Sequence, residues 1–173
     1  MVDLKLKDNE FKYVKTTHKR DVARAVILND KNEMCLLNVI RNDEFGNASY
    51  YETPGGGVDS GEDFIKAVIR EVQEEVGLKV EVIAYLGCVD DYYNLIYRNN
   101  INHYYLCKIV GKTKIHHVSL GDDLIHDIIF VNINEAINLY EKSATTKIGK
   151  LLLNREKPIL IEANKILNEK NML

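Results

Sequence analysis

Three glutamates are spaced so that a helix would bring their carboxylates together. On a helix expected over residues 62–76, at about 100° per residue, Glu71, Glu74 and Glu75 share one face, and aliphatic side chains form a neighbouring face. Such carboxylates repel one another by about 0.2–0.5 kcal/mol per pair, which Arg70 offsets only in part. They form either a solvated acidic face or a site for a divalent cation such as Mg²⁺, which prefers oxygen ligands.

A glycine-rich turn precedes this acidic helix. Residues 54–57 read Pro-Gly-Gly-Gly, which forbids regular structure and lets backbone amides and carbonyls point out of the chain. Ser60 and Asp63 have the spacing of a capping box at the helix start, and Gly77 is expected to end the helix. Because the turn can offer a backbone carbonyl and room for a diphosphate, it favours the cation site over a solvated surface.

Residues 56–78 carry a family motif. They read GGVDSGEDFIKAVIREVQEEVGL and match the Nudix box, G-x5-E-x7-R-E-U-x-E-E-x-G-U with U aliphatic, at every specified position. The matching residues are Gly56, Glu62, Arg70, Glu71, Val72, Glu74, Glu75, Gly77 and Leu78. A chance match of this kind has a probability of about 1 in 10 million. The chain therefore resembles the Nudix hydrolase family, and the expected strand order extends the likeness over about residues 20–141.

The resemblance implies both a fold and a reaction. The implied fold class is α/β, a Nudix-type α/β/α sandwich with a mixed β-sheet. The implied reaction is metal-dependent hydrolysis of a diphosphate bond in a nucleoside diphosphate linked to another moiety, with Mg²⁺ or Mn²⁺ as cofactor. The implied metal ligands are Gly55, through its carbonyl, with Glu71, Glu74 and Glu75, and the implied catalytic residues are Glu71, Glu74, Arg70 and Glu62. Glu62 has a simpler alternative role, as a charge that favours the first helical turn.

The group that orients or deprotonates the attacking water stays open. Glu71 and Glu74 are the leading candidates. Family members take this base from different places, including acidic residues late in the chain. Asp122, Asp123 and Asp127, which lie just before or at the start of a strand expected over residues 127–133, are therefore alternatives.

The substrate's variable part should lie against residues outside the motif. The expected substrate-binding residues are Tyr51, Arg41, Arg24, Gly56 and Gly57. Strand alternation places Tyr50 and Tyr51 on opposite faces, so one can stack on a base while the other packs in the core. The two arginines are candidate phosphate contacts. We expect a small nucleotide substrate: a nucleoside triphosphate, canonical or oxidised, or a nucleotide-sugar.

Two other functions stay open. A nucleotide-binding sensor without catalytic activity would be expected to have lost metal carboxylates, and this chain keeps them all. An RNA 5′-end pyrophosphohydrolase needs a basic track, which the lysines of residues 5–20 could form. The net charge of −3 argues against a nucleic-acid partner.

Length and composition predict one domain in an ordinary globular chain. The 173 residues are 46% hydrophobic and 28% charged, which excludes disordered and low-complexity chains. We expect a single domain over residues 1–173, with a core of about 20–141 and a helical extension of about 143–173 that could pair with a second subunit as a homodimer. Three cysteines in apolar stretches, no apolar run of about 20 residues and no hydrophobic signal region predict a cytoplasmic protein without membrane contact.

The remaining elements follow from hydrophobic patterning. Residues 1–18 suggest one or two edge strands, and residues 22–28 and 34–40 a buried hairpin. Residues 79–89 and 102–110 read as strands joined by a loop over residues 90–98. Asn134 is expected to cap a helix over 135–142, a further helix covers 146–154, and Pro158 opens the last one.

Overall fold

The computed structural model describes residues 1–43, 46–116 and 122–171. Within them, strands β1 (Val2–Leu6), β2 (His18–Leu28), β3 (Met34–Asp43), β4 (Gly46–Glu52), β5 (Gly55–Gly57), β6 (Leu78–Tyr93), β7 (Arg98–Lys112) and β8 (Ile125–Val131) form one sheet. The helices are α1 (Phe64–Val76), α2 (Ile133–Ser143) and α3 (Lys147–Asn171), and the short 3₁₀ turns are η1 (Asn94–Ile96) and η2 (Asp122–Leu124).

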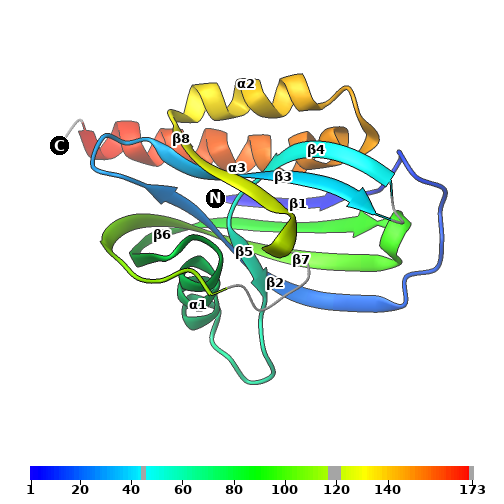
Figure 1. Ribbon diagram of the computed structural model, residues 1–173, viewed down its shortest axis with the longest axis horizontal. Helices are drawn as coiled ribbons and strands as arrows, with labels where there is room; N and C mark the ends of the chain where they lie inside the picture. Colours follow the sequence, from blue (N-terminus) through cyan, green and yellow to red (C-terminus); the bar gives the residue numbers. More distant parts are fainter. Residues whose placement is uncertain (44–45, 117–121, 172–173) are drawn as a thin grey trace.

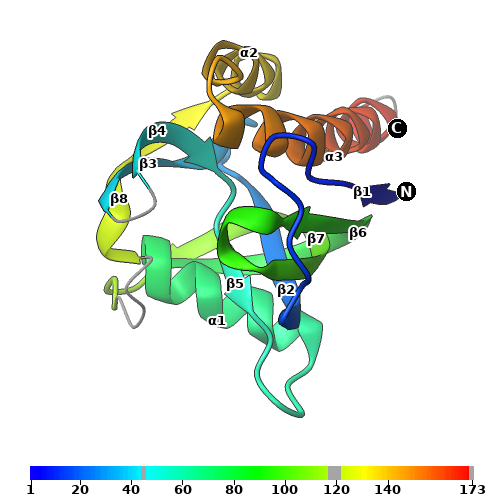
Figure 2. The ribbon, with the colours of Figure 1, turned by 90° about the vertical axis from the view of Figure 1, so that its right-hand side faces the viewer.

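The sheet lies between two helical layers. Its order is β1-β6-β7-β2-β3-β4, with β5 added to β2 and β8 added to β3. The β1–β6 and β2–β7 pairs are parallel and the other pairs are antiparallel, so the sheet is mixed. Helix α1 covers one side, whereas α2 and α3 lie together on the other (Figures 1 and 2). The expected α/β/α sandwich with a mixed sheet is confirmed.

The first two long strands, β2 and β3, separate soon after their turn. Residues 22–28 of β2 are all buried, as expected of a core strand. In the described part of the chain, however, β2 and β3 pair only at Leu28 and Met34. Further along, the same edge of β2 pairs with β5, with Val22 opposite Gly57 and Arg24 opposite Gly55. The expected hairpin is therefore closed only at its turn, and β3 leaves with β4 and β8 as a separate group of strands.

The helix caps differ from the sequence expectation at two starts and agree at one end. Helix α1 begins at Phe64, and Asp63 is its N-cap, accepting hydrogen bonds from the amides of the second and third helical residues. The expected capping box starting at Ser60 was wrong. Gly77 ends α1 in the left-handed conformation at φ 64°, as expected. Helix α2 is capped by Asn132 and not by Asn134, because the Asn132 side chain accepts from the amide three residues later at 2.9 Å.

The hairpin of β6 and β7 is longer than expected. Residues 90–93 continue β6, and η1 makes the turn in place of a loop over residues 90–98. Asn99 supports the pairing near the turn by donating to Asp90 at 2.6 Å, and Asn94 of η1 fixes the turn to the N-terminal segment by donating to the carbonyls of residues 8 and 11. Near the N-terminus, only β1 forms, as an edge strand parallel to β6.

The two expected C-terminal helices are one continuous helix, α3, with Pro158 in its interior. Proline removes one helical hydrogen bond. Packing outweighs this loss, because Leu152, Ile159, Leu160 and Ala163 on either side of Pro158 are buried in the core. None of the helices in residues 1–43, 46–116 and 122–171 is both long and apolar enough to cross a membrane.

A buried carboxylate fixes α3 to the sheet. Glu156 is fully buried and accepts hydrogen bonds from the Tyr104 hydroxyl at 2.8 Å, the Thr53 hydroxyl at 3.1 Å and Arg155 Nε at 2.9 Å. Buried charges are tolerated when they are paired and hydrogen-bonded. The three donors come from β7, the β4–β5 connection and α3 itself, so one side chain sets the position of the helix.

We expect Glu156→Gln to lower the free energy of unfolding by about 3 kcal/mol, because Arg155 would lose its nearest carboxylate, at 2.9 Å within the core. The value lies at the low end for a broken buried pair because Arg155 keeps Glu52 at 3.5 Å and Asp91 at 3.9 Å. Urea unfolding measures the change. The control is Glu169→Gln, which removes an exposed carboxylate from the same helix and should have little effect. Equal stability of the two variants would contradict the role of Glu156.

Candidate functional site

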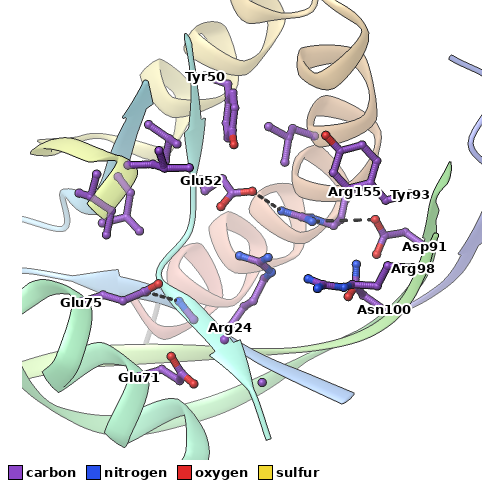
Figure 3. Close-up of a pocket in the computed structure, with 18 of the residues that line it drawn as sticks. Arg24, Tyr50, Glu52, Glu71, Glu75, Asp91, Tyr93, Arg98, Asn100 and Arg155 are labelled. Carbon is purple, nitrogen blue, oxygen red and sulfur yellow. Dashed lines mark hydrogen bonds and ion pairs between the residues drawn. The ribbon is translucent and has the colours of Figure 1, made fainter. Parts of the chain in front are cut away.

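A cavity of about 540 Å³ opens where the β3–β4–β8 group leaves the rest of the sheet. Its wall is formed by residues of β2 to β7, the η2–β8 junction, α1 and α3. Figure 3 shows Glu71 and Glu75 on the α1 side and Tyr50 at the far side, with Arg24 between them. The cavity therefore has chemically different ends.

Arg70 organises the acidic end of the cavity. Its guanidinium donates to both oxygens of Glu62 at 2.9 and 2.8 Å, to Glu71 at 2.8 Å, to Glu74 at 3.2 Å and to the Gly57 carbonyl at 2.9 Å. These hydrogen bonds raise the pKa of Arg70, and they lower the pKa of Glu62 from 4.5 to about 2. One cation thus holds three carboxylates of the motif and ties them to β5.

The glycines of β5 lie directly against the carboxylates. The amide of Gly55 donates to the buried Glu75 at 2.7 Å. Gly55 has φ +143°, and a Cβ there would overlap the backbone of Ala23, while a Cβ on Gly56 would overlap the Glu71 carboxylate. The expectation that residues 54–57 forbid regular structure was wrong for 55–57, because glycine allows the close approach at which β5 pairs with β2.

The donors at this end suit a hard divalent cation. Glu71, Glu74 and Glu75 all line the cavity, and carboxylate oxygens are the preferred ligands of Mg²⁺ and Mn²⁺. Among the residues that the structure describes, no group of three or more His, Cys, Asp or Glu side chains is gathered closely enough to enclose a metal ion. Arg70 holds Glu71 and Glu74 while Gly55 holds Glu75, so a cation bound by these carboxylates would share their oxygens with these donors or replace them.

Arginines line the middle of the cavity, and sequence reasoning found only some of them. Those on the wall outside α1 are Arg20, Arg24, Arg41, Arg98 and Arg155. Arg24 and Arg41 were expected there. Arg24 is buried and donates to Asn102 and to the Thr53 carbonyl, both at 3.0 Å, and Arg41 pairs with Asp43 at 3.1 Å.

The other three arginines could be found only from strand and helix packing. The β2–β7 register sets His18 beside Arg98 and Arg20 beside Asn100, residues about 80 positions apart in the chain. Arg155 reaches the cavity from α3, where it pairs with Glu52 and Asp91 (Figure 3). No local motif signals either arrangement.

The far end of the cavity is apolar and aromatic. Tyr50 and Tyr93 line it together with aliphatic side chains of β3, β8 and α3, which are Leu37, Val39, Ile125, Ile148, Leu151 and Leu152. Tyr50 is on the cavity wall, and Tyr51 is not among the lining residues. The two tyrosines therefore differ in the way that strand alternation predicts, but the one that faces the candidate substrate site is Tyr50 and not the expected Tyr51. Burial raises the pKa of the Tyr50 hydroxyl, which is therefore neutral.

The alternative acidic residues lie away from this wall. Asp123 and Asp127 are exposed and are not among the lining residues, and the Asp127 carboxylate accepts from the amide of Ile128. The side chain of Asp122 lies outside the described residues. In the described part of the chain, the acidic side chains on the wall are those of Glu52, Asp59, Glu71, Glu74, Glu75 and Asp91.

Comparison with known proteins places this geometry in a family. Residues 18–152 match the NUDIX domain. The chain is 39% identical over 65 residues to an RNA pyrophosphohydrolase of Pelagibacter ubique, covering 37% of this chain and 39% of that protein. It is 30% identical over 96 residues to an RNA pyrophosphohydrolase of Wolbachia pipientis subsp. Culex pipiens, covering 49% and 59%. The chain thus spans less than two thirds of the length of these relatives.

Solved structures show the same fold. A NUDIX hydrolase from Nitrosomonas europaea superposes with a TM-score of 0.60 at 20% identity, covering 78% of this chain and 86% of that one. A MutT protein from Methanosarcina mazei superposes with a TM-score of 0.57 at 22% identity, covering 84% and 99%.

Arg70→Gln should return the pKa of Glu62 from about 2 toward its ordinary 4.5. Because the folded-state pKa is depressed, the stabilisation from ionised Glu62 is complete above about pH 4.5 and is lost as the pH falls through about 2. A ¹³C NMR titration of the Glu62 carboxyl measures this directly. Lys66→Gln, an exposed change on the same helix, is the control and should leave the titration as it is in the parent protein. A midpoint near 4.5 in the parent protein would contradict the Arg70–Glu62 contact.

Proposed function

The chain belongs to the NUDIX family, and on this basis we propose that it hydrolyses a diphosphate bond in a nucleotide with the help of a divalent cation. One observation carries the proposal: a single cavity joins carboxylates held by Arg70, a glycine strand in contact with them, a row of arginines and an aromatic wall. Water would add to one phosphorus, the P–O–P bridge would break, and two phosphate-bearing products would leave.

The acidic end is the proposed reaction centre. Glu71, Glu74 and Glu75, with the Gly55 carbonyl, would hold Mg²⁺ or Mn²⁺, which when bound neutralises phosphate oxygens and makes bound water more acidic. Glu71 and Glu74 face the cavity and are the leading groups to orient the attacking water and take its proton. Arg70 acts through these carboxylates as a positioning residue.

The rest of the cavity suits a nucleotide. Guanidinium groups bind phosphate oxygens, and an aromatic side chain can stack on a base. Tyr50 and the aliphatic side chains of α3 enclose the far end, where a base would be removed from water. A volume of about 540 Å³ is in the range of small-molecule sites. These features favour a small nucleotide as substrate.

A second substrate class is favoured by a separate observation. The curated relatives that the chain resembles are RNA pyrophosphohydrolases, although the matches span 31–59% of their lengths. An RNA 5′ end would need a basic path leading to the cavity. Lys12, Lys15 and Lys19 are exposed in the segment that leads to Arg20, and they are the side chains that would form such a path.

Phosphate-product analysis tests the proposal. The panel contains nucleoside triphosphates, including 8-oxo-guanine nucleotides, nucleotide-sugars, diadenosine polyphosphates and RNA with a 5′-triphosphate, each with Mg²⁺ and with EDTA. We expect Mg²⁺-dependent cleavage of at least one class and a loss of about 100-fold or more in kcat for Glu74→Gln, since a metal ligand is removed. Glu81→Gln, an exposed change on β6, should retain the activity of the parent protein within about twofold.

Each remaining outcome has a distinct meaning. Binding of nucleotides without turnover in any arm would contradict the hydrolase and favour a nucleotide sensor. Turnover that persists in Glu74→Gln would contradict the assigned reaction centre. Cleavage of the triphosphorylated RNA at a higher kcat/KM than the free triphosphate would select the second substrate class.

A further inference from the structure

Three arginines of the cavity form no ion pair with a carboxylate of the described residues. Arg20, Arg24 and Arg98 line the same cavity, and in residues 1–43, 46–116 and 122–171 no carboxylate oxygen lies within 4.0 Å of their side-chain nitrogens. Arg24 contacts only the neutral oxygens of Asn102 and Thr53. The other two arginines of the wall differ, because Arg41 pairs with Asp43 and Arg155 with Glu52 and Glu156.

Arg20 is close enough to Arg98 and Arg24 for the like charges to lower its pKa. The pKa of Arg24 is instead raised, because its burial and Arg155, which lower it, are outweighed by Glu52, Tyr104 and Glu156. Desolvation, and next Arg98 and Arg24, lower the pKa of Arg20 to about 10, although the residue as a whole is exposed and Glu71 and Glu52 act in the opposite direction. Like charges in a partly buried cavity raise the free energy of the folded chain unless an anion sits among them. Within the described part of the chain, Arg20, Arg24 and Arg98 all line the cavity without forming an ion pair, so the arrangement suits an anionic ligand.

The position of Arg20 indicates how close the anionic ligand would lie to the proposed reaction centre. A Cβ on Gly57 would lie 3.3 Å from Arg20 Nη1, so the guanidinium borders the same glycine strand that touches Glu71. The cationic group therefore starts next to the proposed reaction centre. In the view of Figure 3, Arg24 lies between Glu75 and the pair formed by Arg98 and Asn100, so the cations extend away from the carboxylates.

Two buried polar atoms beside the arginines also lack a protein partner. Arg98 Nε and Asn100 Oδ1 are buried without a hydrogen-bond partner among the described residues, and the Asn100 side chain belongs to a residue only 8% exposed. A buried polar group without a partner costs about 1–3 kcal/mol. Both residues line the cavity, so a ligand there can satisfy them: an anionic oxygen accepts from Arg98, and a hydroxyl donates to Asn100.

We propose that Arg20, Arg24 and Arg98 form a subsite for a phosphate group additional to the two of the cleaved diphosphate, and that a substrate hydroxyl beside it donates to Asn100 Oδ1. The inference rests on the proposed function and narrows its substrate to nucleotides with three consecutive phosphates, in preference to nucleotide-sugars with two. The triphosphate is the shared chemistry of a free nucleoside triphosphate and of a triphosphorylated RNA 5′ end. Two phosphates would bind at the acidic end of the cavity, and the third would bind to the arginines.

Kinetics with base-matched substrates test the selectivity. For UTP against UDP-glucose and ATP against ADP-ribose, the parent protein should show the higher kcat/KM for the triphosphate. Arg98→Gln should lower kcat/KM for the triphosphate about 10- to 100-fold and that for the nucleotide-sugar less than about threefold, because only the triphosphate loses a charge-assisted contact. Arg20→Gln should act in the same direction, and Lys108→Gln, an exposed change on β7, should change neither.

A binding measurement separates the subsite from the reaction. Calorimetry with inorganic tripolyphosphate and pyrophosphate, without divalent cation, should show weaker tripolyphosphate binding in Arg98→Gln and little change for pyrophosphate. Thermal unfolding checks that the variant is folded, which we expect because it removes repulsion. A triphosphorylated oligonucleotide, compared with the free triphosphate, distinguishes the two sources.

The outcomes divide cleanly. If the protein hydrolyses these substrates and Arg98→Gln changes kcat/KM equally for triphosphates and nucleotide-sugars, or for neither, the subsite is overturned. The proposed function is then unaffected. Selective loss of tripolyphosphate binding without hydrolysis of any substrate supports the subsite and contradicts the proposed function. Tripolyphosphate binding that is unchanged in both Arg98→Gln and Arg20→Gln overturns the subsite whatever the activity.

Discussion

The contacts of Arg70 are the interaction on which the site depends. Helix α1 places Glu71 and Glu74 on the wall of the cavity, and the segment before the helix brings Glu62 to the same arginine, so three negative charges lie close together. The guanidinium of Arg70 holds all three and reaches the Gly57 carbonyl. The helix face is thereby tied to β5, where glycine alone permits the approach. Without this cation, mutual repulsion would separate the carboxylates from one another.

The cavity exists because two groups of strands diverge and α3 closes the opening between them. Strand β5 occupies the edge of β2 that β3 leaves, and this exchange opens the space. Helix α3 is held by the buried Glu156, and its neighbour Arg155 reaches across to Glu52 and Asp91. The same helix supplies the aliphatic wall facing Tyr50. The C-terminal segment, expected as an extension of the core, is thus part of the wall of the candidate site.

The sequence was sufficient to predict local structure where the residues of a single segment determine it. The spacing of Glu71, Glu74 and Glu75 determined which side chains face one way, and Gly77 marked the end of the helix. The sequence was insufficient where the packing of distant segments decides which side chains face the cavity. Arg20 and Arg98 become neighbours only through the parallel β2–β7 register, and Tyr50 faces the cavity only because β4 packs with that face inward. Pro158 stays inside α3 because core packing outweighs a local breaker, which no helix rule applied to the segment alone predicts.

The central claim is that the carboxylates organised by Arg70 hold a divalent cation against the glycine strand. Anomalous diffraction from crystals soaked in Mn²⁺ tests it most directly. The account predicts one or more manganese peaks within about 2.5 Å of oxygens from Glu71, Glu74 and Glu75, with Gly55 adjoining. A well-ordered cavity with no peak at these oxygens, or with manganese bound only elsewhere on the protein, would contradict it.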